Sequence, residues 1–330
     1  MNLRLVEVYL PQEKGKQFEE LVAEYSSLGM WQKKLEQNQL LFKILLSSGE
    51  VEPLVDCLLE KFKDIKEFRL LLLPVEASLP RLESTENSFG LPAAPNRINR
   101  EEIYTNVAAS IHFSWTQISL LLLSSTIAAV GLARNSEVVI IGAMVIAPLL
   151  KPNMALAVAT ILGDLTLVIR TIRIGLIGIL LPIGFSILIG LLYPISPDVP
   201  EIAIRTKLTL SDIVVALASG AAAAISLTAG EISSIVGVMV SVALLPPLVT
   251  WGMLTGSGEW EPAFGAMLLV TANIASLNLG AIATLLLQNV RPTSWWENIK
   301  AKKLTQIATG AWIILLAGLI CIIFIKFKAV

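Results

Sequence analysis

The stretch of sequence that decides the fold is Gly131-Leu-Ala-Arg-Asn-Ser-Glu-Val-Val-Ile-Ile-Gly-Ala-Met-Val-Ile-Ala-Pro-Leu-Leu-Lys-Pro-Asn153, an apolar run that Pro148, Lys151, Pro152 and Asn153 interrupt. Proline has no backbone N–H, so within a helix Pro148 would leave the carbonyl of Met144 unpaired, and Pro152 would do the same to the carbonyl of Pro148. Irregular backbone is tolerated at membrane depth only where it is packed inside protein or lines a wet cavity. This stretch is therefore the first candidate for a functional site.

The composition is that of a membrane protein with a soluble head. Of the 330 residues, 55% are hydrophobic and 15% are charged, whereas about a quarter are charged in ordinary soluble proteins. Residues 1–88 hold 26 of the 51 charged residues. No basic segment followed by a long apolar segment opens the chain, so we expect no cleaved signal and a head that stays in the cytoplasm.

The head, residues 1–75, alternates strand and helix patterns. Strands are predicted at 2–10, 31–36, 39–46 and 65–73, and amphipathic helices at 14–26 and 50–62. The order βαββαβ is that of a ferredoxin-like α+β domain. We expect it to serve assembly of a homo-oligomer or, as the alternative, to sense a small ligand.

A linker and an amphipathic segment follow the head. Residues 76–98 are rich in Pro, Ser and Asn and are predicted to be a linker. Residues 99–113 carry Ile103, Val107 and Ile111 on one side and predict a helix at the membrane interface. The single histidine, His112, is interpreted as an interface residue.

Residues 114–330 contain seven apolar runs, and a bilayer core needs about 20 apolar residues per spanning helix. The runs are 114–133, 138–161, 174–193, 212–230, 234–254, 263–287 and 305–325. Lys and Arg are more numerous in the loops that share a side with the head than in those opposite, which predicts a multi-pass membrane protein with a cytoplasmic N-terminal domain. The small residues at 216–226 predict a close approach of neighbouring helices.

The two halves of the membrane domain resemble each other. Gly142, Met144 and Pro148 in the first half correspond to Gly237, Met239 and Pro246-Pro247 in the second. This predicts an inverted repeat of three plus three spans with proline-broken helices near the midplane, as in many secondary transporters; chance recurrence in apolar sequence is the alternative.

Polar groups inside these runs outline a predicted pathway for a solute or ion. Pro246 and Pro247 would release the carbonyls of Val242 and Ala243, giving ligands for an ion or polar solute. Lys151 would be costly at mid-membrane unless it lies at a helix end and extends to water, and Asn273 and Asn278 are either pathway residues or contacts between helices. The full predicted set is Met144, Pro148, Lys151, Asn153, Asp164, Val242, Ala243, Pro246, Pro247, Asn273 and Asn278.

Five motifs in order resemble a known family. They are Arg134-Asn-Ser-Glu-Val-Val-Ile-Ile-Gly-Ala-Met-Val-Ile-Ala-Pro-Leu-Leu150, Gly163-Asp164, Ala216-Leu-Ala-Ser-Gly220, Val242-Ala-Leu-Leu-Pro-Pro-Leu248 and Thr271-Ala-Asn273. Over residues 100–290 the chain resembles the bacterial membrane proteins of domain of unknown function 389, an uncharacterised hydrophobic domain. The resemblance implies a multi-pass protein of the bacterial inner (plasma) membrane but no activity, substrate or site residue.

The leading hypothesis is a membrane transporter or channel for a small polar or ionic solute. The alternative is a non-transporting oligomeric sensor or scaffold whose head binds a ligand or partner. An enzyme is not expected, because the sequence has one His and neither a Ser–His pair nor a His–Glu metal motif. No cofactor, metal or nucleic-acid partner is expected, and the two cysteines, Cys57 and Cys321, cannot form a disulfide framework.

Overall fold

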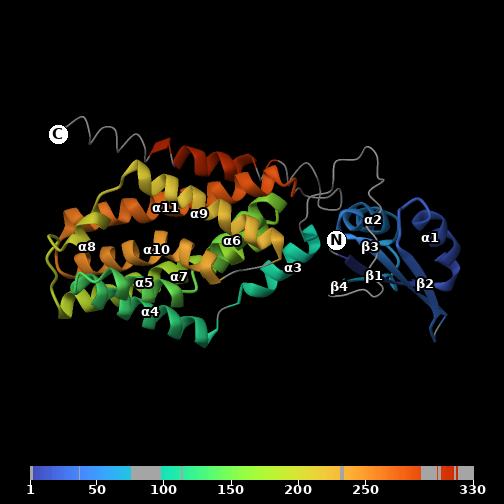
Figure 1. Ribbon diagram of the computed structural model, residues 1–330, viewed down its shortest axis with the longest axis horizontal. Coiled ribbons are helices and arrows are strands. Elements are labelled where there is room, and N and C mark those ends of the chain that lie inside the picture. The colour runs from blue at the N-terminus through green and yellow to red at the C-terminus, as the bar shows by residue number, and fades with distance from the viewer. Residues whose placement is uncertain are drawn as a thin grey trace. The chain divides into compact units, whose positions relative to one another are not determined.

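The computed structural model (Figure 1) describes residues 3–36, 38–75, 98–112, 114–230, 234–290, 303, 306–315 and 317–318. The chain forms two compact units, a head unit that contains Met1–Ile103 and a membrane unit that contains Tyr104–Pro292 and Asn298–Val330. The boundary between the units falls inside one helix, α3 (Arg100–Ser110). The predicted linker, 76–98, lies almost entirely outside the described residues.

The head unit is a four-stranded antiparallel sheet with two helices. Its elements are β1 (Leu3–Pro11), the short 3-10 helix η1 (Gln12–Lys14), α1 (Gly15–Val22), β2 (Gly29–Lys34), β3 (Gln39–Ser47), α2 (Ser48–Phe62) and β4 (Arg69–Val75). The strands lie in the order β2-β3-β1-β4, with Val8 opposite Phe42 and Leu70. The predicted order of strands and helices is confirmed, while membership of the ferredoxin-like fold stays a prediction.

The core of the head follows from alternation along the strands. Val6, Val8 and Leu10 are fully buried, and they form one cluster with Phe18 of α1 and Leu54 of α2. Successive strand residues point to opposite faces, so these positions place both helices over the same face of the sheet. The opposite face holds the Glu7–Lys43 ion pair, 2.6 Å between oxygen and nitrogen.

The first turn of α3 is tied to the head unit. Arg100 forms an ion pair with Asp56 at 2.8 Å, and Arg4 forms one with Glu102 at 3.1 Å. Burial raises the pKa of the Asp56 carboxyl, although the neighbouring Arg100 opposes this effect. The helix predicted between 99 and 113 is present, with Ile103, Val107 and Ile111 buried along one side.

The membrane unit is a bundle of long apolar helices (Figure 1). Its elements are α4 (Trp115–Ala133), α5 (Glu137–Ile146), α6 (Leu150–Leu162), α7 (Leu165–Leu192), α8 (Pro200–Ala203), the 3-10 helix η2 (Ile204–Thr206), α9 (Leu210–Ala229), α10 (Ser234–Gly256) and α11 (Trp260–Leu287).

The predicted number of seven spans is not reached among the described residues. Five helices there are long and apolar enough to cross a membrane, and α5 with α6 makes a sixth if this bent pair counts as one span. The seventh predicted run, 305–325, is described only in part, as the short apolar helix Gln306–Leu315.

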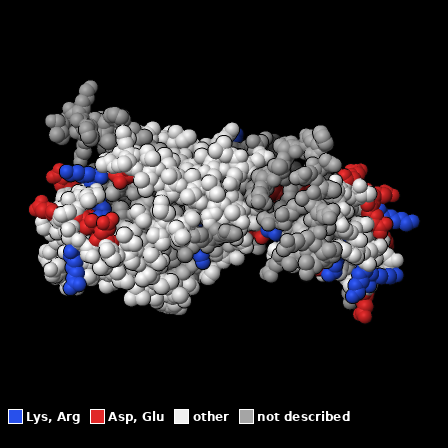
Figure 2. Space-filling view, viewed as in Figure 1, with Lys and Arg blue, Asp and Glu red and all other residues white. Residues whose placement is uncertain are grey.

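Burial identifies the centre of the bundle. In the most apolar window of each helix, 67% of α11 is buried but only 22% of α7, so α11 is central and α7 turns much of its surface outward. Figure 2 shows few charged side chains on the drawn face of the membrane unit apart from those gathered at the end that holds α8, where Asp198 and Lys207 are exposed. This distribution suits a bilayer around the helices.

Glycines bring two helix pairs into backbone contact. A methyl group added at Gly220 of α9 would overlap the carbonyl oxygen of Leu277 on α11, and one at Gly280 of α11 would overlap that of Leu217 on α9. The pair α7–α10 repeats the arrangement, with Gly190 against Met253 and Gly256 against Ile187. The close approach predicted for the small-residue run 216–226 is therefore confirmed.

Candidate functional site

The candidate site is the break between α5 and α6. Helix α5 ends at Ile146, Ala147 is extended with φ −68° and ψ 121°, and α6 begins at Leu150. The two helix axes differ by 55°. Because a residue that precedes proline is disfavoured in the helical conformation, Pro148 accounts for the extended Ala147, and the predicted interruption at Pro148 is present.

Pro152 does not extend the break, contrary to the prediction. It is the third residue of α6, and the N–H groups of a first helical turn have no partner within the helix. The missing N–H of Pro152 therefore removes no helical hydrogen bond from the carbonyl of Pro148.

The second predicted break is also absent, because α10 continues from Ser234 to Gly256 through Pro246 and Pro247. The side-chain amide of Asn273 on α11 donates a hydrogen bond to the carbonyl oxygen of Ala243 at 2.7 Å. This is the carbonyl that Pro247 leaves without a helical donor, so a neighbouring helix supplies the missing hydrogen bond. At the positions compared, the membrane unit thus has one break in a helix rather than two.

Side chains from three helices hold the first break. Ser241 of α10 donates to the carbonyl of Ala147 at 3.1 Å, and Asn153 of α6 donates to the carbonyl of Leu149 at 2.8 Å. The amide of Asn278 on α11 donates to Asn153 Oδ1 at 3.4 Å and to the carbonyl of Ile274 at 2.9 Å. The break is therefore a polar junction of α6, α10 and α11.

Two amide oxygens on α11 remain open. Asn273 is 4% exposed and Asn278 is fully buried, and the Oδ1 atom of each has no hydrogen-bond partner among the described residues. Buried polar atoms of native proteins are nearly always paired with protein or ordered water, so an open amide oxygen is a place where water or a hydrophilic ligand can bind.

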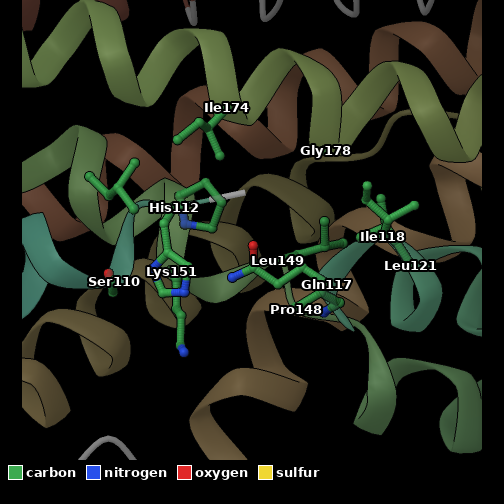
Figure 3. A pocket seen from close by; sticks show the side chains of 12 residues that line it. Ser110, His112, Gln117, Ile118, Leu121, Pro148, Leu149, Lys151, Ile174 and Gly178 are labelled. Atoms are coloured by element: carbon green, nitrogen blue, oxygen red, sulfur yellow. The ribbon is translucent and has the colours of Figure 1, made fainter. Parts of the chain in front are cut away.

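Lys151 lies on the α6 side of the break, as the second residue of that helix. Its side chain is exposed, as expected for a lysine at a helix end, and it helps to line two small hollows of about 30 Å³ each. Figure 3 shows one of them, surrounded by His112 after α3, Gln117 of α4, Pro148 at the break, and Lys151. The ammonium group and the N-terminus of α6 together make this side of the break electropositive.

Three predicted site residues have other positions. Asp164 caps the N-terminus of α7, where its Oδ1 accepts from the N–H groups of Thr166 and Leu167, and its Oδ2 accepts from the hydroxyl of Tyr104 at 2.9 Å. Burial, and then this hydrogen bond to Asp164, raise the pKa of Tyr104. The side chain of Val242 is 38% exposed. Met144 is buried and lies within α5, two residues before its end.

The match to a known protein family covers the region of the chain that contains the break. Residues 144–279 match the model of a family described as a domain of unknown function, DUF389. An uncharacterized protein from Methanocaldococcus jannaschii is 32% identical over 325 residues, which cover 98% of this chain and 99% of the relative. The chain belongs to the DUF389 family. No solved structure matches it.

The DUF389 match includes every residue of the predicted site and both proline segments. It also includes residues that the sequence interpretation missed, namely Ser241 at the break and the buried hydroxyls of Thr250 and Ser276, which have no partner among the described residues. The sequence signal that could have identified these three residues is a polar residue within an apolar run. Among the described residues no group of three His, Cys, Asp or Glu side chains could hold a metal ion.

Proposed function

We propose that this protein is a membrane transporter or channel for a small polar or ionic solute, which binds at the α5–α6 break. The observation that carries the proposal is the 55° break itself, placed where Ser241 and Asn278 reach it from α10 and α11. Broken helices buried in protein are the usual location of solute and ion sites in transporters.

The local chemistry supports more than one charge class of solute. The open Oδ1 atoms of Asn273 and Asn278 accept hydrogen bonds or coordinate a cation, whereas Lys151 and the N-terminus of α6 attract an anion. The solute panel must therefore contain small anions, small cations and neutral polar molecules.

Flux into liposomes tests the proposal. The purified full chain should move at least one member of a panel that includes phosphate, chloride, potassium, ammonium and glycerol. Asn278→Leu removes both the contact with Asn153 and the open acceptor, and we expect about a tenfold loss of flux, the equivalent of one hydrogen bond in a barrier.

The matched control is Thr284→Val on the same helix. Among the described residues the hydroxyl of Thr284 bonds to the carbonyl of Gly280, one turn back, so the control should leave flux within about twofold of the parent rate. Flux that is blank for the whole panel, or equally reduced in both variants, would argue against a solute site at the break.

We infer the cellular arrangement from the loop charges. We place the protein in the cytoplasmic (inner) membrane with its head in the cytoplasm; a homo-oligomer is proposed separately, from the small size of the head. Arg170 and Arg173 near the start of α7 would then lie on the cytoplasmic side, as the positive-inside rule favours. Labelling of Cys57 in a Cys321→Ser background, compared with a cysteine placed at Asp198, reports the two sides in intact cells.

A second candidate is a sensor or scaffold without transport activity. It is favoured by the internal pairing of the carbonyls of Ala147 and Ala243, which neighbouring helices already satisfy. A metabolite that raises the thermal midpoint of the full chain and protects Cys57 from alkylation, in a protein with no measurable flux, would support this function.

A further inference from the structure

The face of the head sheet that lies opposite α1 and α2 is rich in apolar side chains. In an antiparallel sheet with helices on one face, the other face normally meets water and is polar. Val6, Val8 and Phe42 pack with α1 and α2, so the odd-numbered positions of the four strands form the opposite face. Large apolar side chains occupy many of these positions, including Leu3, Leu5, Trp31, Leu45, Leu71 and Leu73.

These side chains form a continuous patch. The strand register places Leu45, Leu5 and Leu73 side by side in one row across β3, β1 and β4. The indole of Trp31 extends the row to β2, because it lies over Gly29, where an added methyl group would meet the ring at 2.8 Å. Trp31 is 55% exposed and Leu73 is 39% exposed. A contiguous exposed apolar patch marks a site of contact with a protein or a membrane.

One ion pair lies at the middle of this face. Lys43 of β3 and Glu7 of β1 are opposite each other in the register, and their charged atoms are 2.6 Å apart. The gap between β3 and β1 is also the midline of the strand order β2-β3-β1-β4. A two-fold axis above this midline and parallel to the strands would therefore place Glu7 of one copy opposite Lys43 of a second copy. The same axis places Leu5 opposite Leu45 of the second copy.

We propose that this face of the head binds the same face of a second copy of the chain. The two sheets stack about 10 Å apart, and the two Glu7–Lys43 pairs join into one network of four alternating charges. A lipid surface is disfavoured as the occupant, because the carboxylate of Glu7 would then be turned toward hydrocarbon. The inference goes beyond the proposed transport and does not depend on it.

The size of the face meets the requirement of a stable pair. Four strands cover about 19 Å and the paired residues from Leu3 to Tyr9 cover about 23 Å, so the flat footprint is about 440 Å² per copy. Side chains project from this plane, so two copies together reach the lower limit of about 1,000 Å² for a specific interface. Lys33 and Arg69 of opposite copies approach each other only at the corners, which the angle of about 30° between stacked sheets carries apart.

Cross-linking of the full chain tests the contact. In a Cys57→Ser/Cys321→Ser background, Leu5→Cys places a thiol next to the axis, so a short bismaleimide should join two copies in detergent. Lys61→Cys on α2 is the matched control, because it is exposed in the same unit but lies on the helix side of the sheet. It should give at least about fivefold less cross-linked dimer.

Exchange of the charges distinguishes a second copy from any other occupant. Lys43→Glu and Glu7→Lys each place like charges at the centre of the face, so each variant alone should lose about tenfold in cross-linking through Leu5→Cys. In a mixture of the two variants, each acid of one copy faces a lysine of the other, and the mixed dimer should form within about twofold of the parent yield. The pairing within each chain stays broken in that mixture, so a purely structural role of the ion pair predicts no recovery.

Three outcomes would overturn the inference. Cross-linking through Leu5→Cys that does not exceed the Lys61→Cys control would exclude the contact. Charge variants that do not recover on mixing would exclude a second copy as the occupant. A Leu5→Cys thiol that is shielded from maleimide without forming dimers would assign the face to another segment of the same chain if the shielding persists in detergent, or to the lipid surface if it occurs only in liposomes.

Discussion

The α5–α6 segment and α10 both carry proline within an apolar run, yet the chain bends by 55° around Pro148 and continues as one helix through Pro246 and Pro247. At the bend, Ala147 leaves the helical conformation and its carbonyl accepts from Ser241. In α10 the carbonyl of Ala243 stays in place and accepts from Asn273. The same residue type thus interrupts one apolar run and not the other, and in both places a neighbouring helix donates to a nearby main-chain carbonyl.

The largest effect on stability is expected from a substitution that separates α11 from α9. Helix α11 carries the amides of Asn273 and Asn278. Gly220→Leu would place a side chain against the carbonyl of Leu277 and force α9 and α11 apart. We expect a loss of about 3 kcal/mol or more in the free energy of unfolding, measured by denaturant titration in mixed micelles. Gly142→Leu on α5, where an added Cβ meets no atom within 4 Å, is the control, and an equal loss in both variants would contradict the packing role.

The next effect tests why α10 stays continuous. Asn273→Leu leaves the Ala243 carbonyl without its donor and should cost about 1–3 kcal/mol of unfolding free energy. In a Pro247→Ala background the new N–H can donate to Ala243, so the same change should cost about 1 kcal/mol less. Strictly additive effects in this double-mutant cycle would show that Asn273 does not replace the donor missing at Pro247.

A smaller effect tests the hydrogen bond between Ser241 of α10 and the Ala147 carbonyl at the bend. Ser241→Ala removes the contact with the Ala147 carbonyl and should destabilise the protein by about 1 kcal/mol. Ser219→Ala is the comparison, since Ser219 is equally buried but bonds to Val215 of its own helix. Indistinguishable unfolding midpoints for the two variants would mean that the contact between α10 and the bend adds no stability.

The smallest effect concerns positions at which the two segments are alike. Gly142 on α5 and Gly237 on α10 both have space for a methyl group. Gly142→Ala and Gly237→Ala should each change the unfolding free energy by less than about 1 kcal/mol, with a tendency to stabilise, because alanine loses less backbone entropy than glycine. A large loss at either position would reveal a contact with a second copy of the chain.

The features that sequence predicted well are governed by local patterns. Alternation along residues 2–10 predicted the strand that is β1, and the missing N–H of Pro148 predicted the interruption that the structure shows between Ile146 and Leu150. The sequence also contained a signal for the cap formed by Asp164, because Asp after Gly at the start of an apolar run is typical of a helix N-terminus. Asp164 was nevertheless interpreted as a pathway residue.

The features that sequence missed depend on contacts between distant residues. The continuity of α10 rests on Asn273, which lies 30 residues after the carbonyl that it serves, and the hydrogen bond at the bend joins Ser241 to a carbonyl 94 residues earlier. Neither spacing follows a helical or strand period, so no periodicity could have revealed it. The proposed internal repeat rested on similar residues in two runs, and the two runs differ where those contacts differ.

The reciprocal glycine contacts limit how this protein could change shape. In α7–α10 and in α9–α11 one main chain touches another, and no side chain at these points can switch rotamer to permit sliding. Each pair would thus travel as a single stiff block in any conformational cycle. The rotation that opens or closes the bundle would then fall to residues 147–149, three positions with no helical ladder to hold them.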